Sequence, residues 1–212
     1  MKASVKNEVD QAEWNQALEK SEYGTIYQTT YFADSVRDIT KEQPIFITVE
    51  DHGKTLGQLL LFKTCRFHGR VYDKPLGNLL VKLLMKTKPL YHWHFGPVTP
   101  IAEERGEAYG KTLDAVHTIA KDEGVDISSG YPHPLDDKIE SFKAMGFESK
   151  EVATFVIDLT KDIEQLWLGL EKHSARKNVE RAVERGVTVE RVKDEDEFVE
   201  YFNVLNETRI RD

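Results

Sequence analysis

Two hydrophobic periods alternate along this chain, and their order restricts the fold more than any other feature of the sequence. Apolar runs at residues 45–49 and 56–65 flank the turn residues 51–54, which predicts an antiparallel hairpin. Farther along, strand-like runs are separated by segments that carry apolar residues at helical spacing. A hairpin followed by alternating helices and strands predicts the α/β class, with a mixed sheet flanked by helices.

The same periods give the expected elements and their order. We expect helices over residues 11–20, 28–38, 76–86, 102–122 and 135–145, and strands over residues 45–49, 56–65, 90–95, 125–129 and 152–159. A second section then has helices over residues 161–172 and 174–185, a strand over 187–192 and a helix over 194–209. This last helix repeats the pattern of residues 11–20, and its Phe198, Tyr201, Phe202 and Leu205 are expected to face inward. We therefore expect a complete first domain, 1–159, and an incomplete second one, 160–212.

Charge is distributed unevenly along the chain. The 29 basic and 37 acidic residues give a net charge of −8, which argues against a general binder of phosphate backbones. Residues 66–100 nevertheless carry +5 and residues 171–193 carry +3, so the remainder carries −16. Two local basic surfaces are expected to meet an anionic partner, although chance clustering would give the same pattern.

Cysteine content and the N-terminal segment indicate the compartment. Cys65 is the only cysteine, so the chain has no intrachain disulfide and no cysteine-based metal site. The first 14 residues lack the apolar core of a signal peptide, and the longest unbroken apolar run elsewhere is 59–62. These features favour a cytoplasmic protein in a reducing compartment.

Several short stretches resemble the FemAB family of aminoacyltransferases, which build peptidoglycan cross-bridges and have a GNAT-like fold. In the first section they are GTIYQ at 24–28, FADSVR at 32–37, HFGPV at 94–98, GF at 146–147 and IDL at 157–159. In the second section they are LW at 166–167, SARKNVERA at 174–182, GV at 186–187 and TRIR at 208–211. The resemblance spans the chain but stops within the second domain of a usual member. It implies one GNAT-like domain and the start of another.

The resemblance also implies a reaction and two binding residues. An acceptor amine would attack the carbonyl of an aminoacyl ester on tRNA, which needs positioning, a proton acceptor and oxyanion stabilisation, without a cofactor or metal. An anionic acceptor such as a muropeptide precursor needs cations aimed at its phosphates. By the family's pattern these are Arg37, where lysine is more usual, and Arg211 of the Thr-x-x-Arg motif. Each is otherwise an exposed surface arginine, and no catalytic residue is assigned.

Two basic segments have both a functional and an ordinary interpretation. Lys177, Arg181 and Arg185 form a stripe at i, i+4 and i+8, which fits contact with tRNA or, more simply, an exposed helix face with salt bridges. Residues 76–88 combine a leucine face with lysines. That combination fits peripheral contact with an anionic bilayer or, more simply, a helix folded over its own sheet.

Two other patterns bear on cofactor and metal chemistry. RGEAYG at 105–110 approaches the CoA-binding signature of GNAT enzymes, but Ala108 stands where its first glycine belongs, so acetyl-CoA is disfavoured as the donor. His92 and His94 share one face of a strand, and without a third ligand at suitable spacing we expect them to pack rather than bind a metal. The alternatives to an aminoacyltransferase are a non-catalytic anion-binding module and, after it, a CoA-dependent N-acetyltransferase.

Overall fold

The computed structural model describes residues 1–66, 76–101, 103, 105–136 and 139–211, which form two compact units, Met1–Thr154 and Phe155–Asp212. The first unit contains a five-stranded sheet in the order β1-β2-β3-β4-β5. Its strands are β1 (Lys2–Lys6), β2 (Gln43–Asp51), β3 (Lys54–Cys65), β4 (Pro89–His94) and β5 (Ile127–Tyr131). All neighbouring strands are antiparallel except β4 and β5, which run parallel. The predicted mixed α/β sheet is confirmed.

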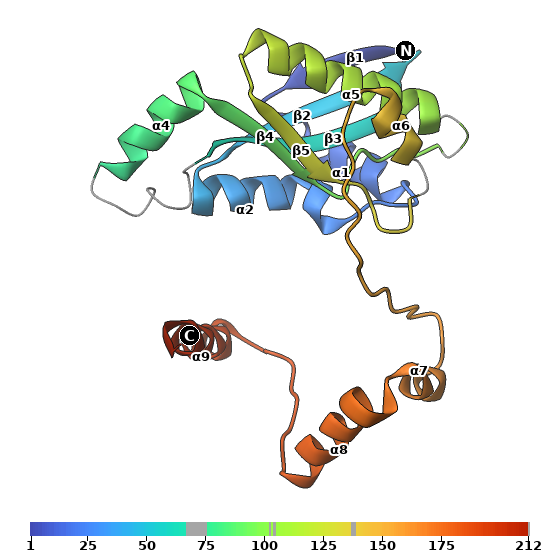
Figure 1. Ribbon diagram of the computed structural model, residues 1–212, viewed down its shortest axis with the longest axis vertical. Helices are drawn as coiled ribbons and strands as arrows, with labels where there is room; N and C mark the ends of the chain where they lie inside the picture. The colour runs from blue at the N-terminus through green and yellow to red at the C-terminus, as the bar shows by residue number, and fades with distance from the viewer. Residues whose placement is uncertain (67–75, 102, 104, 137–138, 212) are drawn as a thin grey trace. The chain divides into compact units, whose positions relative to one another are not determined.

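Helices cover both faces of this sheet, as Figure 1 shows. One face carries α1 (Gln11–Glu19) and α2 (Thr30–Thr40), which are connected through the short 3-10 helix η1 (Ile26–Gln28). The other face carries α5 (Arg105–Asp122) and α6 (Ile139–Ala144). Helix α4 (Gly77–Thr87) precedes β4 and contacts β3 and β4.

Alternation along the strands sorts their side chains into two cores. The core under α5 contains Ile45, Ile47, Leu59, Leu61, Tyr91, Trp93, Tyr109, Leu113, Ala115, Val116 and Phe142. The core under α1 and α2 contains Trp14, Ala33, Phe46, Leu60 and Phe62. Because β2 and β3 contribute alternate residues to each core, the hairpin is buried on both faces and its position in the sheet is fixed.

Strand β1 has no counterpart among the predicted elements. It pairs antiparallel with β2, with Ala3 opposite Val49 and Val5 opposite Ile47. Those two residues are the apolar members of a five-residue strand whose other positions are polar. An edge strand needs to bury only one face, so its sequence signal is weak.

Two predicted strands are absent from the described structure. Residues 152–159 have no regular secondary structure and no partner strand among the described residues, and Phe155 is fully exposed. Residues 187–192 likewise have no regular secondary structure, and Val189 is almost fully exposed. Both predictions are wrong for the same reason. β-branched residues favour a strand only where another strand supplies hydrogen bonds and a surface to pack on.

The second unit consists of helices and connecting chain. They are α7 (Ile163–Gly169), a π-helical turn η3 (Lys172–Arg176), α8 (Lys177–Glu184) and α9 (Glu195–Arg211). The expected inward face of α9 is wrong for Phe198, Tyr201 and Phe202, which are each about half exposed, while Leu205 is partly buried. Both cores of the described residues lie in the first unit. Among the described residues of either unit, no helix has both the length and the apolar character needed to span a membrane.

Candidate functional site

Two parallel strands end side by side in the first unit, and polar and aromatic side chains collect there. His94 ends β4 and lies opposite Tyr131, which ends β5. The backbone N–H of Gly96 donates to the Tyr131 carbonyl over 3.1 Å and keeps the two strand ends together. In open α/β sheets, ligands bind outside the carboxyl ends of the parallel strands. The candidate site therefore lies at this end of β4 and β5.

Alternation along β4 decides which of its side chains reach the site. Tyr91 and Trp93 point into the core under α5, so His92 and His94 lie on the opposite face. The ring centroids of the two histidines are 5.6 Å apart, and the His92 ring stacks on Phe62 of the other core. The predicted shared face of His92 and His94 is confirmed.

Glu42 holds the first of these histidines. Its Oε2 atom lies 2.8 Å from His92 Nε2, and the Thr64 hydroxyl donates to its Oε1 atom over 3.1 Å. Both members of the Glu42–His92 pair are largely shielded from solvent, so the carboxylate fixes the orientation of the imidazole. The described residues contain no group of three or more histidine, cysteine, aspartate or glutamate side chains that could hold a metal ion.

His94 is the half-buried titratable group of the site. Its ring lies against those of Tyr27 and Phe32, with centroid distances of 5.7 and 6.2 Å. Burial lowers the pKa of His94 below its ordinary value of 6.5, the neighbouring His92 lowers it further, and the charge of Glu42 opposes both effects. The His94 imidazole is therefore neutral at pH 7 and able to accept a proton.

A second group of side chains surrounds the start of α5. The Arg105 guanidinium donates to the Glu22 carboxylate and lies 4.6 Å from the centre of the Tyr23 ring. The Arg105 side chain is only 8% exposed. Burial opposes its charge, but hydrogen bonds to Glu22 and Tyr23 and the charge of Asp136 raise its pKa above the ordinary value. Arg105 therefore stays charged, and its charge is already paired within the fold.

His133 and Asp136 join this group from the chain that follows β5. The Tyr109 hydroxyl donates to the Asp136 carboxylate, and burial together with this hydrogen bond raises the pKa of Tyr109. The His133 ring stacks on Tyr23 at 4.9 Å, and its Nδ1 atom accepts from the Leu135 N–H over 3.2 Å. Burial lowers the pKa of His133, against the charge of Asp136. His133 is thus a neutral imidazole whose proton is on Nε2.

A row of rings connects the two groups. Phe95 lies 5.1 Å from Tyr27 and 6.2 Å from His133, measured between ring centroids. We call this set the aromatic row, and it consists of His92, His94, Tyr27, Phe95, His133 and Tyr23. Glu42 lies at one end of the row and Arg105 at the other. Aromatic surface that includes neutral imidazoles and is bounded by fixed charges suits the binding of a polar substrate and the transfer of a proton.

Sequence reasoning missed several members of this site, among them Tyr23, Glu22 and His133. These three residues come from connecting segments that are far apart in the sequence, and no spacing rule links such segments. The available signals were local. Tyr23 directly precedes the GTIYQ stretch, and His133 stands between two prolines, which indicates a loop.

Arg37, the predicted acceptor contact of the first unit, lies in the last turn of α2. Its side chain is half-exposed and forms ion pairs with Asp34, at 2.7 Å, and with Asp38, at 3.6 Å. The same helix contributes Phe32, which contacts the His94 ring. Arg37 is therefore on an element that borders the aromatic row, and two carboxylates already share its charge.

The other predicted site residues belong to the second unit. Arg211 ends α9, and its side chain lies outside the part of the chain that the structure describes. Lys177 and Arg181 are one turn apart on α8, and Arg185 is the C-terminal cap of that helix. All three are exposed, and none of them forms an ion pair with another described residue.

Two residues of the family-like stretches have structural roles at the point where β3 and β4 separate. The pairing of these strands runs from Cys65 and Pro89 to Phe62 and His92 and stops there. Beyond it, the fully buried Gln28 side chain bonds to backbone groups of both strands. A Cβ atom on Gly96 would lie 2.7 Å from Leu59 Cδ1 and 3.0 Å from the Gln28 amide, so only glycine leaves room for this arrangement.

The CoA-like stretch at 105–110 is also occupied by structural contacts. Arg105 is engaged by Glu22, as described above. Ala108 is fully buried against β3, where a Cβ atom on Gly57 would lie 3.3 Å from Ala108 Cβ. The alanine that replaces the first glycine of the signature therefore serves the packing of α5 on the sheet.

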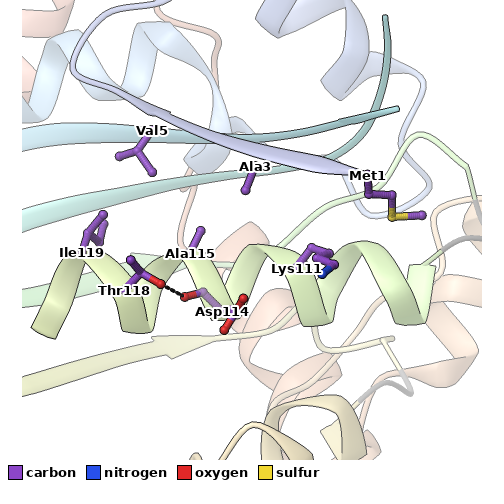
Figure 2. A pocket seen from close by; sticks show the side chains of 8 residues that line it. All are labelled: Met1, Ala3, Val5, Lys111, Asp114, Ala115, Thr118 and Ile119. Atoms are coloured by element: carbon purple, nitrogen blue, oxygen red, sulfur yellow. Dashed lines mark hydrogen bonds between the residues drawn. The ribbon is translucent and has the colours of Figure 1, made fainter. Parts of the chain in front are cut away.

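A separate groove lies at the opposite edge of the sheet, between β1 and α5 (Figure 2). It has a volume of about 280 Å³ and is lined by Met1, Ala3, Val5, Lys111, Asp114, Ala115, Thr118 and Ile119. The Thr118 hydroxyl donates to the Asp114 backbone carbonyl over 2.9 Å, and the Met1 amine is paired with Asp51 at 3.0 Å. The lining contains no histidine or cysteine, so the groove lacks the imidazole groups of the aromatic row.

Comparison with known proteins bears on the fold. No protein-family model matches the sequence, and no curated protein matches it. Among solved structures, the crystal structure of FemX aligns with 100% of this chain, with a TM-score of 0.64 and 20% sequence identity. The chain therefore has the fold of the part of FemX with which it aligns. The alignment covers 50% of the FemX chain, so this chain spans about half the length of that structure.

Two acetyltransferase structures align over a smaller part of the chain. An aminoglycoside acetyltransferase from an uncultured soil metagenomic sample, in complex with trehalose, has a TM-score of 0.48 and 12% identity and covers 74% of this chain and 95% of its own. The ribosomal-protein-alanine N-acetyltransferase from Brucella melitensis biovar Abortus 2308 has a TM-score of 0.47 and 10% identity, over 74% of this chain and 99% of its own. The FemX alignment supports the FemAB-like fold that the sequence resemblance implied, and the expected division into a complete first domain and an incomplete second one stays a prediction.

Proposed function

We propose that this chain is part of a FemAB-like acyltransferase, which transfers an amino acid or acyl group to an amine of an anionic acceptor such as a peptidoglycan precursor. The observation that carries the proposal is the alignment with FemX along the whole chain, at a TM-score of 0.64. The family-like stretches support it, because two of them meet in the structure. Tyr27 of GTIYQ lies 5.7 Å from His94 of HFGPV, between ring centroids.

The proposed proton acceptor is His94. The acceptor amine attacks the carbonyl carbon of the aminoacyl ester, and a C–N bond forms as the ester C–O bond breaks. The proton released from the nitrogen passes to the His94 imidazole and from there to the leaving hydroxyl oxygen. The lowered pKa of His94 supports this role, because it keeps the imidazole unprotonated at pH 7.

The proposed acceptor contacts are Arg37 and Arg211, as the family resemblance implies. Arg37 suits this role because it is half-exposed on α2, the helix whose Phe32 borders His94. Its ion pairs with Asp34 and Asp38 would be exchanged for a phosphate of the acceptor. Such an exchange costs part of the binding free energy and favours release after transfer.

The proposed donor is aminoacyl-tRNA, with Lys177, Arg181 and Arg185 as contacts to its phosphates. Their exposure on and beside α8 supports this assignment, because exposed cations one turn apart suit a polyanion. Acetyl-CoA is the disfavoured donor, because Arg105 is paired with Glu22 and Ala108 is packed against β3.

Transfer of a labelled amino acid from charged tRNA to a muropeptide precursor tests the proposal. We expect Arg37→Ala and Arg211→Ala each to lower kcat/KM by about tenfold or more, the loss expected for one charge-assisted hydrogen bond. His94→Gln should lower kcat by about a hundredfold or more at pH 7, the usual contribution of a general base. Arg191→Ala removes an exposed arginine of the second unit outside the proposed set and should retain full activity.

Other results would assign a different function. Calorimetric binding of the muropeptide without transfer, lost in Arg37→Ala, would favour the non-catalytic anion-binding module. Heat of binding with acetyl-CoA at millimolar concentration would favour a CoA-dependent N-acetyltransferase. Full transfer activity in both Arg37→Ala and Arg211→Ala would show that the acceptor binds elsewhere.

A further inference from the structure

Helix α4 turns a row of leucines away from the sheet on which it packs. Leu76, Leu79, Leu80 and Leu83 are 80%, 68%, 44% and 56% exposed. Val81 is only 2% exposed, and α4 contacts β3 and β4. Helix α4 therefore packs on its own sheet, as the simpler interpretation of the sequence has it, but not through its leucine face. The valine side of α4 contacts the sheet, and the leucines face solvent.

The helical period separates these two faces. At about 100° per residue, Leu79 and Leu83 each lie about 160° around the helix from Val81. Leu79, Leu80 and Leu83 lie on one side of the helix and form one continuous stripe, and the exposed Leu76 directly precedes the helix as its N-terminal cap residue. Lys82 and Lys86 lie one turn apart along one flank of this stripe. Contiguous apolar surface of this kind, bordered by polar side chains, marks an interaction site.

The charge around the leucine stripe identifies the chemistry of the partner. Residues 77–88 contain Lys82, Lys86 and Lys88 and no acidic residue, and none of these lysines forms an ion pair with another described residue. Lys41, at the C-terminal end of α2, joins Lys82 in lining a groove of about 210 Å³ beside the helix. This local cationic surface belongs to a chain with a net charge of −8. The surface that covers α4 is therefore expected to be both apolar and anionic.

We propose that α4 lies in the plane of an anionic lipid bilayer, with its leucines at the boundary of the acyl chains and its lysines at the level of the phosphates. A bilayer interface provides both features, since apolar burial and attraction to anionic headgroups act together on an amphipathic helix. A second copy of the chain suits the stripe less well. Two such helices face to face would bring their flanking lysines together and repel each other.

Co-sedimentation with vesicles tests this proposal and requires no transfer activity. The wild-type chain should bind vesicles of phosphatidylcholine mixed with phosphatidylglycerol at low salt, more weakly at high salt, and should not bind phosphatidylcholine alone. The variant Leu79→Ser with Leu83→Ser should bind at least about tenfold more weakly, because it removes apolar area from the interface. The variant Lys82→Glu with Lys86→Glu should bind more than about 25-fold more weakly, since each lysine contributes about fivefold.

Matched variants elsewhere in the first unit provide the controls. Ile39→Ser with Leu135→Ser removes two exposed apolar side chains outside α4, and Lys111→Glu with Lys121→Glu places the same charge change on α5. Both should bind vesicles as tightly as the wild type, and circular dichroism should show every variant folded. No binding at low salt, or equal binding to vesicles with and without phosphatidylglycerol, would overturn the proposal. A wild-type dimer that the leucine variant converts to a monomer in sedimentation velocity would assign the stripe to a second copy and also overturn it.

Discussion

Gln28 connects η1 to two strands, and replacing it tests what holds the sheet together where β3 and β4 separate. Its side-chain carbonyl accepts from the Leu60 N–H over 2.7 Å. Its amide donates to the backbone carbonyls of His94, over 2.7 Å, and of Leu60, over 3.2 Å. Its own backbone carbonyl accepts from the Trp14 indole over 2.7 Å. These bonds lie in the buried interior of the first unit, where water does not replace a lost partner.

Gln28→Leu keeps a side chain of similar size and removes the three side-chain hydrogen bonds. The Leu60 N–H and the His94 carbonyl, which make the two shorter bonds, then lose their buried partners. Each unsatisfied group costs about 1–3 kcal/mol, so the free energy of unfolding of the first unit should fall by about 2–6 kcal/mol. That loss is a large part of the roughly 5–15 kcal/mol that stabilises a typical domain.

Urea unfolding followed by tryptophan fluorescence measures this change, because Trp14 and Trp93 are buried in the two cores of the first unit. Gln43→Leu changes an exposed glutamine of β2 and should alter the free energy of unfolding by less than about 0.5 kcal/mol. A Gln28→Leu protein within about 0.5 kcal/mol of the wild type would refute the role of Gln28 as the connection between the separated strands.

Three smaller perturbations test other contacts of the first unit. Gly130→Ala would make a methyl group overlap the Trp93 ring and should lower the free energy of unfolding in urea by about 1–3 kcal/mol. An unchanged midpoint of the urea unfolding curve would contradict this packing. Glu22→Gln should cost about 1 kcal/mol, since the carboxylate is 59% exposed although its arginine partner is buried, and equal stability would show that the pair contributes nothing. Because folding lowers the pKa of His94 below 6.5, the unfolded chain binds the extra proton, and stability should fall as the pH drops below 6.5. The fall should be smaller in His94→Gln, and parallel stability curves for the two proteins would be inconsistent with the lowered pKa.

Hydrophobic periods predicted the first unit well where an element packs against several neighbours. The β2–β3 hairpin and α5 each bury a regular set of side chains, and their positions follow from spacing alone. The same patterns gave wrong predictions where pairing with another strand determines whether a strand forms. The edge strand β1 forms with two apolar residues, whereas residues 152–159 carry a stronger strand pattern and remain unpaired. A pattern shows that a face can be buried, but the partner strand determines whether it is.

The site could be predicted from the sequence in a similarly limited way. The shared face of His92 and His94 follows from strand alternation, and the structure confirms it. The stacking of His133 on Tyr23 depends on how two distant connections close around α5, which spacing does not encode. The pairing of Arg37 is a different case. Asp34 precedes it by three residues on the same helix, so the i,i+3 ion pair was visible in the sequence.

The family-like stretches of the first unit act mostly on the fold, and this determines which variants test function. Gln28 and Gly96 are required by packing where β3 and β4 separate, so their replacement would lower any activity through lost stability rather than through a lost substrate contact. Substrate recognition needs groups that a ligand can reach, and Arg37 and His94 are such groups. Loss of transfer with retained muropeptide binding in His94→Gln, and loss of both in Arg37→Ala, would therefore separate an aminoacyltransferase from a module that only binds anions.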